Sequence, residues 1–161
     1  WVPYLVRDVM REAERHDTPF AWPRPDPIVM DMATGEVSKQ QPYIHRLTRL
    51  GVAAAEKGRG LPFITEISAT LYGGRTQNWH DGNHLRAATA RAGLELTELD
   101  TAIAADPDRY EAMIKTNEDA HRKAGHWGVP TFAFNGEPFF GQDRIDALLW
   151  RLEQHGLKRK T

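Results

Sequence analysis

The dipeptide Asn135-Gly136 constrains the fold of this chain more than any other feature. The four residues before it, Thr-Phe-Ala-Phe, and the four after it, Glu-Pro-Phe-Phe, have the composition of short strands. Asn-Gly is the strongest two-residue signal for a type I′ turn, which joins antiparallel strands. We therefore predict a β-hairpin here, with Phe132 and Phe134 on one face. Pro138 cannot donate a hydrogen bond to a neighbouring strand, so the second strand is expected at an edge of the sheet.

Helical spacing of apolar residues dominates the chain before this hairpin. Most of these segments end at a glycine or begin at a capping residue such as Asp106, and the first begins at Pro3. The predicted helices cover residues 3–16, 42–57, 61–72, 82–92, 97–105 and 106–123, and a last helix follows the hairpin over 142–155. Residues 18–27 hold four prolines, which forbid a helix and predict an extended connector. A strand over 28–30 is left open, because so short an apolar run does not separate a strand from a packed loop.

Length and composition favour an ordinary globular chain. With 161 residues it is long enough to bury a core without disulfides, and it contains no Cys. With a net charge of -1 the chain has no excess of positive charge that would bind nucleic acid or anionic lipid. No apolar run reaches the length of a membrane span. The lack of Cys excludes a cysteine nucleophile within these residues and favours a cytoplasmic location. The start at Trp1 shows neither an initiating Met nor a basic leader, which suggests an internal segment.

Two segments on either side of the hairpin carry a family resemblance. They are 128–132 (Gly-Val-Pro-Thr-Phe) and 141–146 (Gly-Gln-Asp-Arg-Ile-Asp). Together with the hairpin they resemble the end of the family that contains 2-hydroxychromene-2-carboxylate isomerases, kappa-class glutathione transferases and DsbA-like oxidoreductases. Upstream, residues 4–8 and 18–20 are similar to the helix and proline loop that lead into the helical insertion of those proteins. The agreement is dense after about Gly125 and mainly architectural before it.

The resemblance implies an α/β, thioredoxin-like fold of the DsbA or kappa type with an all-helical insertion. Residues 1–124 would form the helical insertion region, including the proline-rich connector at 18–27, and residues 125–161 would form the C-terminal ββα half. In the relatives a strand-helix-strand unit comes first, and its helix carries the Ser or Cys that acts on a thiol. We expect that unit, and with it the nucleophile, to lie outside this sequence.

The proline turn before the hairpin is the main candidate site. A cis peptide bond before a proline turns the N–H and C=O of the preceding residue outward, where a ligand main chain can reach them. The resemblance favours cis over the commoner trans form at Val129-Pro130, and it implies that Val129, Pro130 and Thr131 hold the cysteinyl part of glutathione. It also implies that Gln142 and Asp143 hold the γ-glutamyl end. That role suits a helix start, whose free N–H groups bind a carboxylate while Asp143 pairs with the α-ammonium. The alternative is that Asp143 only caps the helix.

Four aromatic or imidazole side chains are candidates for a substrate pocket. His126 and Trp127 immediately precede the proline turn and are expected to border the site. Trp79 is a candidate wall for an apolar pocket, and Tyr4 lies on the opening helix that the resemblance brings to the site. Simple packing is the alternative for both tryptophans.

Histidine spacing raises the question of a metal site. His80 and His84 are four residues apart, the spacing of one helix turn, and His121 and His126 flank the end of a predicted helix. No Glu lies between His80 and His84 to complete a zincin motif, and seven histidines produce such spacings readily. We expect no metal.

The resemblance implies a glutathione-dependent isomerase or transferase-like enzyme of the 2-hydroxychromene-2-carboxylate isomerase type. Its partners would be a small-molecule thiol and a small aromatic or conjugated substrate, and it would form a homodimer. One alternative is a DsbA-like thiol-disulfide oxidoreductase, which needs a Cys-containing motif upstream. Another is a non-catalytic glutathione-binding or peptide-binding remnant that lacks the nucleophile segment.

Overall fold

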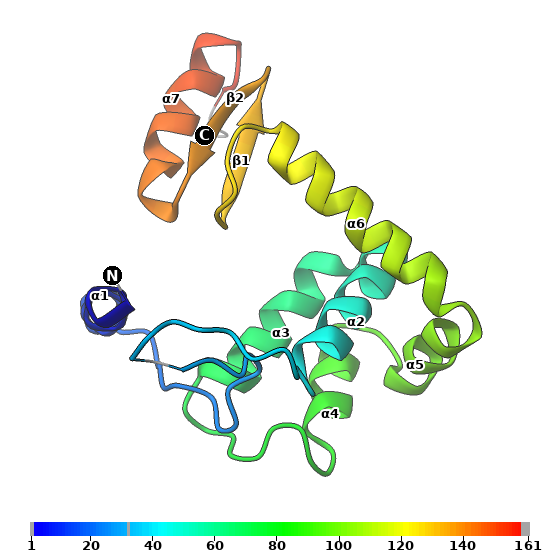
Figure 1. Ribbon diagram of the computed structural model, residues 1–161. Helices are drawn as coiled ribbons and strands as arrows, with labels where there is room; N and C mark the ends of the chain where they lie inside the picture. The colour runs from blue at the N-terminus through cyan, green and yellow to red at the C-terminus, as the bar shows by residue number, and fades with distance from the viewer. Residues whose placement is uncertain (1, 32, 159–161) are drawn as a thin grey trace. The chain divides into compact units, whose positions relative to one another are not determined.

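A computed structural model describes residues 2–31 and 33–158, so Trp1 at the predicted internal start lies outside the described residues. The fold is mostly helical with a small two-stranded sheet (Figure 1). The chain divides into two compact units, Trp1–Glu111 (unit 1) and Ala112–Thr161 (unit 2). This boundary falls inside a helix, whereas the predicted domain boundary follows residue 124 at the end of the same helix; the domain assignment stays a prediction.

Six helices precede the sheet in the described part of the chain. They are α1 (Val2–Arg15), α2 (Ile44–Glu56), α3 (Gly60–Tyr72), α4 (His84–Arg91), α5 (Leu96–Ala105) and α6 (Pro107–Lys123). Each begins and ends within two residues of its predicted bounds. The predicted cap at the start of α6 is confirmed, because the N–H of Arg109 donates to Oδ1 of Asp106 at 3.2 Å. None of the helices in the described ranges has both the length and the apolar composition that crossing a membrane requires.

Helices α2 to α5 pack on one another and enclose the core of unit 1 (Figure 1). The large buried side chains of this core include Leu50, Phe63, Ile67, Leu71, Trp79, Leu85, Leu99 and Tyr110. Trp79 is 1% exposed, and its indole N–H donates to the C=O of Pro25 at 2.7 Å. That bond fastens the proline-rich connector to the helical core.

The segment that follows the connector, residues 28–37, has little regular structure where it is described. An antiparallel bridge joins Met30, at the end of the possible strand over 28–30, to Val37. The turn inside it is organised by Asp31, whose Oδ1 accepts hydrogen bonds from the N–H of Ala33 at 2.8 Å and of Thr34 at 3.0 Å. The main-chain bonds from Thr34 and Ala33 lower the pKa of the Asp31 carboxyl.

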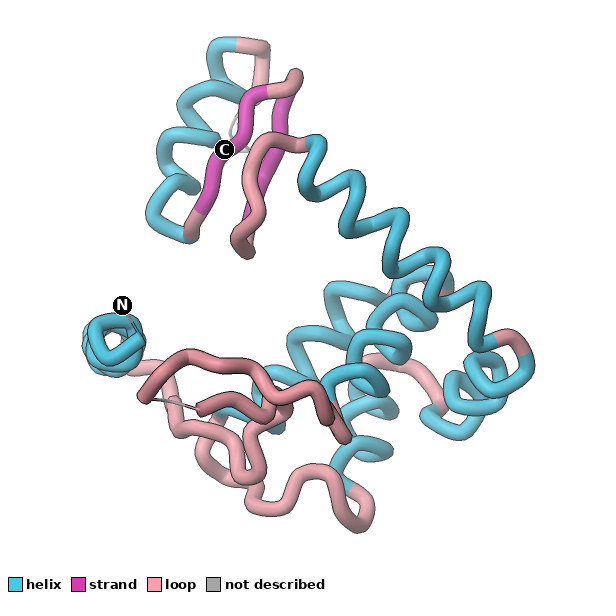
Figure 2. Tube along the Cα trace, in the orientation of Figure 1, coloured by secondary structure: helices cyan, strands magenta, loops and turns pink. Residues whose placement is uncertain are grey.

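The predicted hairpin is confirmed in unit 2. Strand β1 (Thr131–Phe134) pairs antiparallel with β2 (Glu137–Phe140), as Figure 2 shows. Asn135 and Gly136 have φ of +50° and +81°, the left-handed values that a type I′ turn requires at both central positions. Phe132 lies opposite Phe139. Within the described residues the sheet has two strands, so β2 with its Pro138 is an edge strand.

The closing helix begins as a 3-10 turn, η1 (Gln142–Arg144), and continues as α7 (Ile145–Gln154), so the predicted single helix is two elements. Helix α7 lies along the hairpin. Arg151 on α7 donates two hydrogen bonds to the carboxylate of Glu137, at 2.6 and 3.1 Å. Hydrogen bonding to that carboxylate raises the pKa of Arg151.

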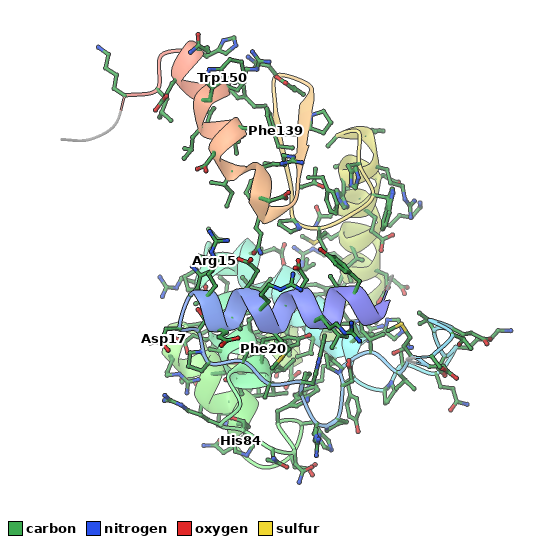
Figure 3. All side chains as sticks on the ribbon, turned by 90° about the vertical axis from the view of Figure 1, so that its left-hand side faces the viewer. Arg15, Asp17, Phe20, His84, Phe139 and Trp150 are labelled. Atoms are coloured by element: carbon green, nitrogen blue, oxygen red, sulfur yellow. The ribbon has the colours of Figure 1, made fainter. Side chains whose placement is uncertain are left out.

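Unit 2 covers little of its own apolar surface. Phe139 is buried between β2 and α7 (Figure 3), but no described residue of α7 is buried, and Trp150 on the same helix is exposed. A two-stranded sheet with one helix is marginal by itself. The stability of the described chain is therefore expected to depend mainly on the core of unit 1.

Substitutions at two leucines of unit 1 test whether stability depends on this core. Leu99 is 0% exposed on α5, and Leu61 is 81% exposed on α3. We expect Leu99→Ala to lower the free energy of unfolding by about 2–5 kcal/mol, because it leaves a cavity in a packed core. Leu61→Ala is the matched control and should change it by less than about 0.5 kcal/mol. Urea denaturation followed by circular dichroism measures both, and equal effects would contradict the assigned core.

Candidate functional site

Both main-chain polar groups of Gly128, just before the proline turn, are hydrogen-bonded. The N–H of Gly128 donates to Nδ1 of His126 at 2.9 Å. Its C=O accepts from the hydroxyl of Thr131 at 2.6 Å and from Nε2 of His121 at 2.8 Å. Because a carbonyl only accepts, Nε2 of His121 carries a hydrogen, whereas Nδ1 of His126 accepts and carries none. The segment is thus anchored to the end of α6 and to the start of β1.

Packing explains why a glycine stands at this position. A Cβ at Gly128 would lie 2.4 Å from Cε2 of Phe140 and 3.1 Å from Cε1 of His126. The His126 ring stacks on the Phe140 ring with centroids 3.9 Å apart, and Trp127 continues the stack at 5.5 Å from His126. No side chain fits between the main chain and this aromatic layer.

Val129 follows the anchored glycine and presents its main chain. The Val129-Pro130 peptide bond is cis, as the resemblance predicts. Val129 is 80% exposed, and among the described residues its N–H and C=O make no hydrogen bond. A donor and an acceptor on an exposed turn are available to the main chain of a ligand.

The proline turn is joined directly to the start of the closing helix. The C=O of Pro130 accepts a hydrogen bond from the N–H of Gly141 at 2.9 Å. Gly141 has a φ of +99°, and a Cβ there would lie 2.4 Å from Oδ1 of Asp143. Position 141 therefore requires glycine. The bond between Pro130 and Gly141 brings the Val129 turn next to Gln142 and Asp143 within unit 2.

The pair Gln142-Asp143 is exposed at the first turn of η1. The alternative role of Asp143 as a helix cap is not found, because neither η1 nor α7 has a side-chain cap bond. Oδ2 of Asp143 lies 3.3 Å from Nη1 of Arg144, and its side chain is 69% exposed. Main-chain N–H groups at a helix start attract a carboxylate, and a free carboxylate attracts an ammonium group.

The four candidate pocket residues fall into two groups. His126 is half-buried and Trp127 is 81% exposed, and both adjoin the proline turn in unit 2. Tyr4, exposed on α1, and Trp79, buried in the helical core, belong to unit 1. Their part in a substrate pocket stays a prediction.

The four histidines considered for a metal site lie in different surroundings. In the part of the chain that the structure describes, no three or more His, Asp or Glu residues are grouped so that they could hold a metal ion. His121 and His126, which the sequence places around a helix end, both bind Gly128. His84 is exposed on α4 (Figure 3), and His80 contacts the ring of Tyr43.

In unit 2 a proline turn leads into a hairpin and is bonded to the start of the closing helix, and a block of helices precedes it in the chain. This arrangement is typical of a thioredoxin-like protein with a helical insertion. Residues 2–153 match the family model of the DSBA-like thioredoxin domain. The chain therefore belongs to the DSBA-like thioredoxin domain family. No curated protein matches it.

The anchoring role of His126 is testable. His126→Phe keeps a ring that can stack on Phe140 but removes the acceptor for the Gly128 N–H. Since one hydrogen bond contributes about 1 kcal/mol, we expect the Gly128 amide to exchange with solvent roughly five times faster. Amide hydrogen exchange measured by NMR provides the value. His155→Phe is the matched control, because His155 packs at 5.1 Å against Phe134 and should leave Gly128 unchanged. An unaltered Gly128 rate in His126→Phe would contradict the assignment.

Proposed function

We propose that this chain acts as a glutathione-dependent isomerase or transferase-like protein of the 2-hydroxychromene-2-carboxylate isomerase type. The observation that carries the proposal is the adjacency of two sets of exposed polar groups. Val129 offers an unpaired main-chain donor and acceptor, and Asp143 offers a carboxylate without a cap bond. The hydrogen bond between Pro130 and Gly141 keeps the two sets side by side.

These groups fit the two polar parts of glutathione. The cysteinyl residue would pair with the main chain of Val129 in the manner of an added strand. The γ-glutamyl end is a zwitterion. Its carboxylate suits the N–H groups at the start of η1, beside Gln142, and its ammonium group suits Asp143. Bound glutathione would supply the thiol chemistry, and no residue of this chain is assigned as the nucleophile.

The surface next to the turn favours an aromatic or conjugated substrate. Trp127 and Phe140 are both exposed, and the half-buried His126 stacks against each of them. Exposed aromatic faces bind flat ligands by offset stacking and exclude water from them. We place the aromatic substrate against Trp127, within reach of a thiol held at Val129.

Glutathione binding tests the assignment of Asp143. We expect Asp143→Asn to weaken the binding of glutathione about tenfold or more, because it removes a charge-assisted bond to the α-ammonium. Asp146→Asn, an equal change at an exposed position on the first turn of α7, is the control and should bind as the unchanged protein does. Isothermal titration calorimetry measures all three.

A second ligand makes this comparison sharper. Cysteinylglycine lacks the γ-glutamyl residue, so its binding should be the same in the unchanged protein and in Asp143→Asn. If Asp143→Asn weakens neither ligand, or both equally, the γ-glutamyl assignment is wrong. If the unchanged protein binds no glutathione at millimolar concentration, the proposed function is wrong.

We also propose that the chain forms a homodimer, supported by the apolar surface of unit 2. Large apolar residues outside the glutathione site are exposed there: Ile145, Trp150 and Leu157. Exposed apolar groups of this kind are typical of interaction surfaces. Sedimentation equilibrium of residues 1–161 should show a dimer at micromolar concentration, and a monomer over the whole accessible range would contradict the proposal.

A further inference from the structure

The hydrogen bond between His126 and Gly128 depends on the charge of the His126 ring. Nδ1 of His126 accepts this bond from the N–H of Gly128 at 2.9 Å, and an imidazole nitrogen accepts only when it carries no hydrogen. A protonated imidazole carries a hydrogen on both nitrogens and donates from each of them. Protonation of His126 therefore removes the acceptor and turns one N–H group toward another.

The bonds on the other side of Gly128 do not share this dependence. Nε2 of His121 donates to the C=O of Gly128 at 2.8 Å, and it carries a hydrogen whether the ring is neutral or protonated. The hydroxyl of Thr131 donates to the same C=O at 2.6 Å and has no charge to change. Acid therefore breaks the bond to the N–H of Gly128 and keeps both bonds to its C=O.

Packing decides which group moves when His126 gains a proton. The His126 ring lies flat on the Phe140 ring, with centroids 3.9 Å apart and planes inclined by 16°, and Trp127 stacks on it at 5.5 Å. A cation also packs favourably on an aromatic face, so the protonated ring keeps this position. The main chain at Gly128 has to move instead, and the next residue is Val129.

The charged groups around His126 leave it free to titrate. The titratable residues in the last two turns of α6, in β1 and β2, and in η1 are Glu118, Asp119, His121, Arg122, Lys123, Glu137, Asp143 and Arg144. All of these except His121 and Lys123 form ion pairs with other residues. His126 itself forms no ion pair among the described residues. No carboxylate is bound to the ring, so its charge follows the pH of the solution.

We propose that His126 is a positioning residue that acts as a proton switch. Its neutral ring holds the turn in the form that presents the main chain of Val129, and protonation releases the turn. Histidine changes its charge between about pH 5 and pH 8, so the turn is held at the upper end of this range and released at the lower end. The effect on glutathione rests on the proposed function, whereas the release itself is a property of unit 2.

A coupling measured by NMR detects the release without any ligand or substitution. Nuclei on the two sides of a hydrogen bond are coupled through it, so the full chain is labelled with ¹³C and ¹⁵N. The coupling between the amide nitrogen of Gly128 and Nδ1 of His126 should be present at about pH 7.5 and lost at about pH 5.5. The bond from Gly141 to Pro130 involves no titratable group and is the internal control. Its coupling should be the same at both pH values.

Three results of this measurement would overturn the proposal. The first is a coupling between Gly128 and His126 that persists at the lower pH. The second is its absence at the higher pH. The third is loss of the Gly141 coupling as well, which would show a general opening of the hairpin rather than a local release.

Glutathione binding tests the consequence for the site. Isothermal titration calorimetry should show about fivefold weaker binding at about pH 5.5 than at about pH 7.5, the effect of one lost hydrogen bond. His126→Phe has no acceptor at either pH, so it should bind at both as weakly as the unchanged protein does in acid. His155→Phe changes a histidine that packs on Phe134 and should keep the full pH dependence.

The two measurements separate this proposal from the proposed function. A pH dependence that survives in His126→Phe, or glutathione binding that is independent of pH while the coupling is lost, would overturn the positioning role. If glutathione binds at neither pH, the proposed function is wrong, and the coupling alone decides whether His126 is a proton switch.

Discussion

The hydrogen bond from the N–H of Gly141 to the C=O of Pro130 is the interaction on which the site depends. The two ends of an antiparallel hairpin lie side by side, so one bond can tie the turn before β1 to the turn after β2. The bonds to Gly128 fix the same turn from its other side. Val129 is therefore held between two anchors while its own main-chain groups stay unpaired. A site that is held in place before binding loses less entropy when a ligand arrives.

The elements that the sequence predicts well are those with local signals. Asn135-Gly136 demands left-handed backbone at two successive residues, and few arrangements other than a tight hairpin satisfy that demand. The helices of unit 1 are bounded by glycines and by the Asp106 cap, and these signals also act within a few residues. The cis form at Val129 and its adjacency to Gln142-Asp143 follow from the family resemblance rather than from composition.

Local signals do not predict contacts between residues that a loop brings together. The sequence places His121 and His126 around a helix end, but it does not indicate that both bind the same glycine. The indole of Trp79 finds its acceptor 54 positions earlier, at Pro25. Family membership establishes the fold, whereas the chemistry has to be argued from such contacts.

Binding of the cysteinyl part of glutathione by the main chain of Val129 is tested by the NMR signal and the solvent exchange of the Val129 amide, with and without glutathione. If the proposed site is correct, this amide is among the most strongly shifted, and its exchange slows when glutathione is bound. Binding that leaves both the shift and the exchange of Val129 unchanged would contradict it.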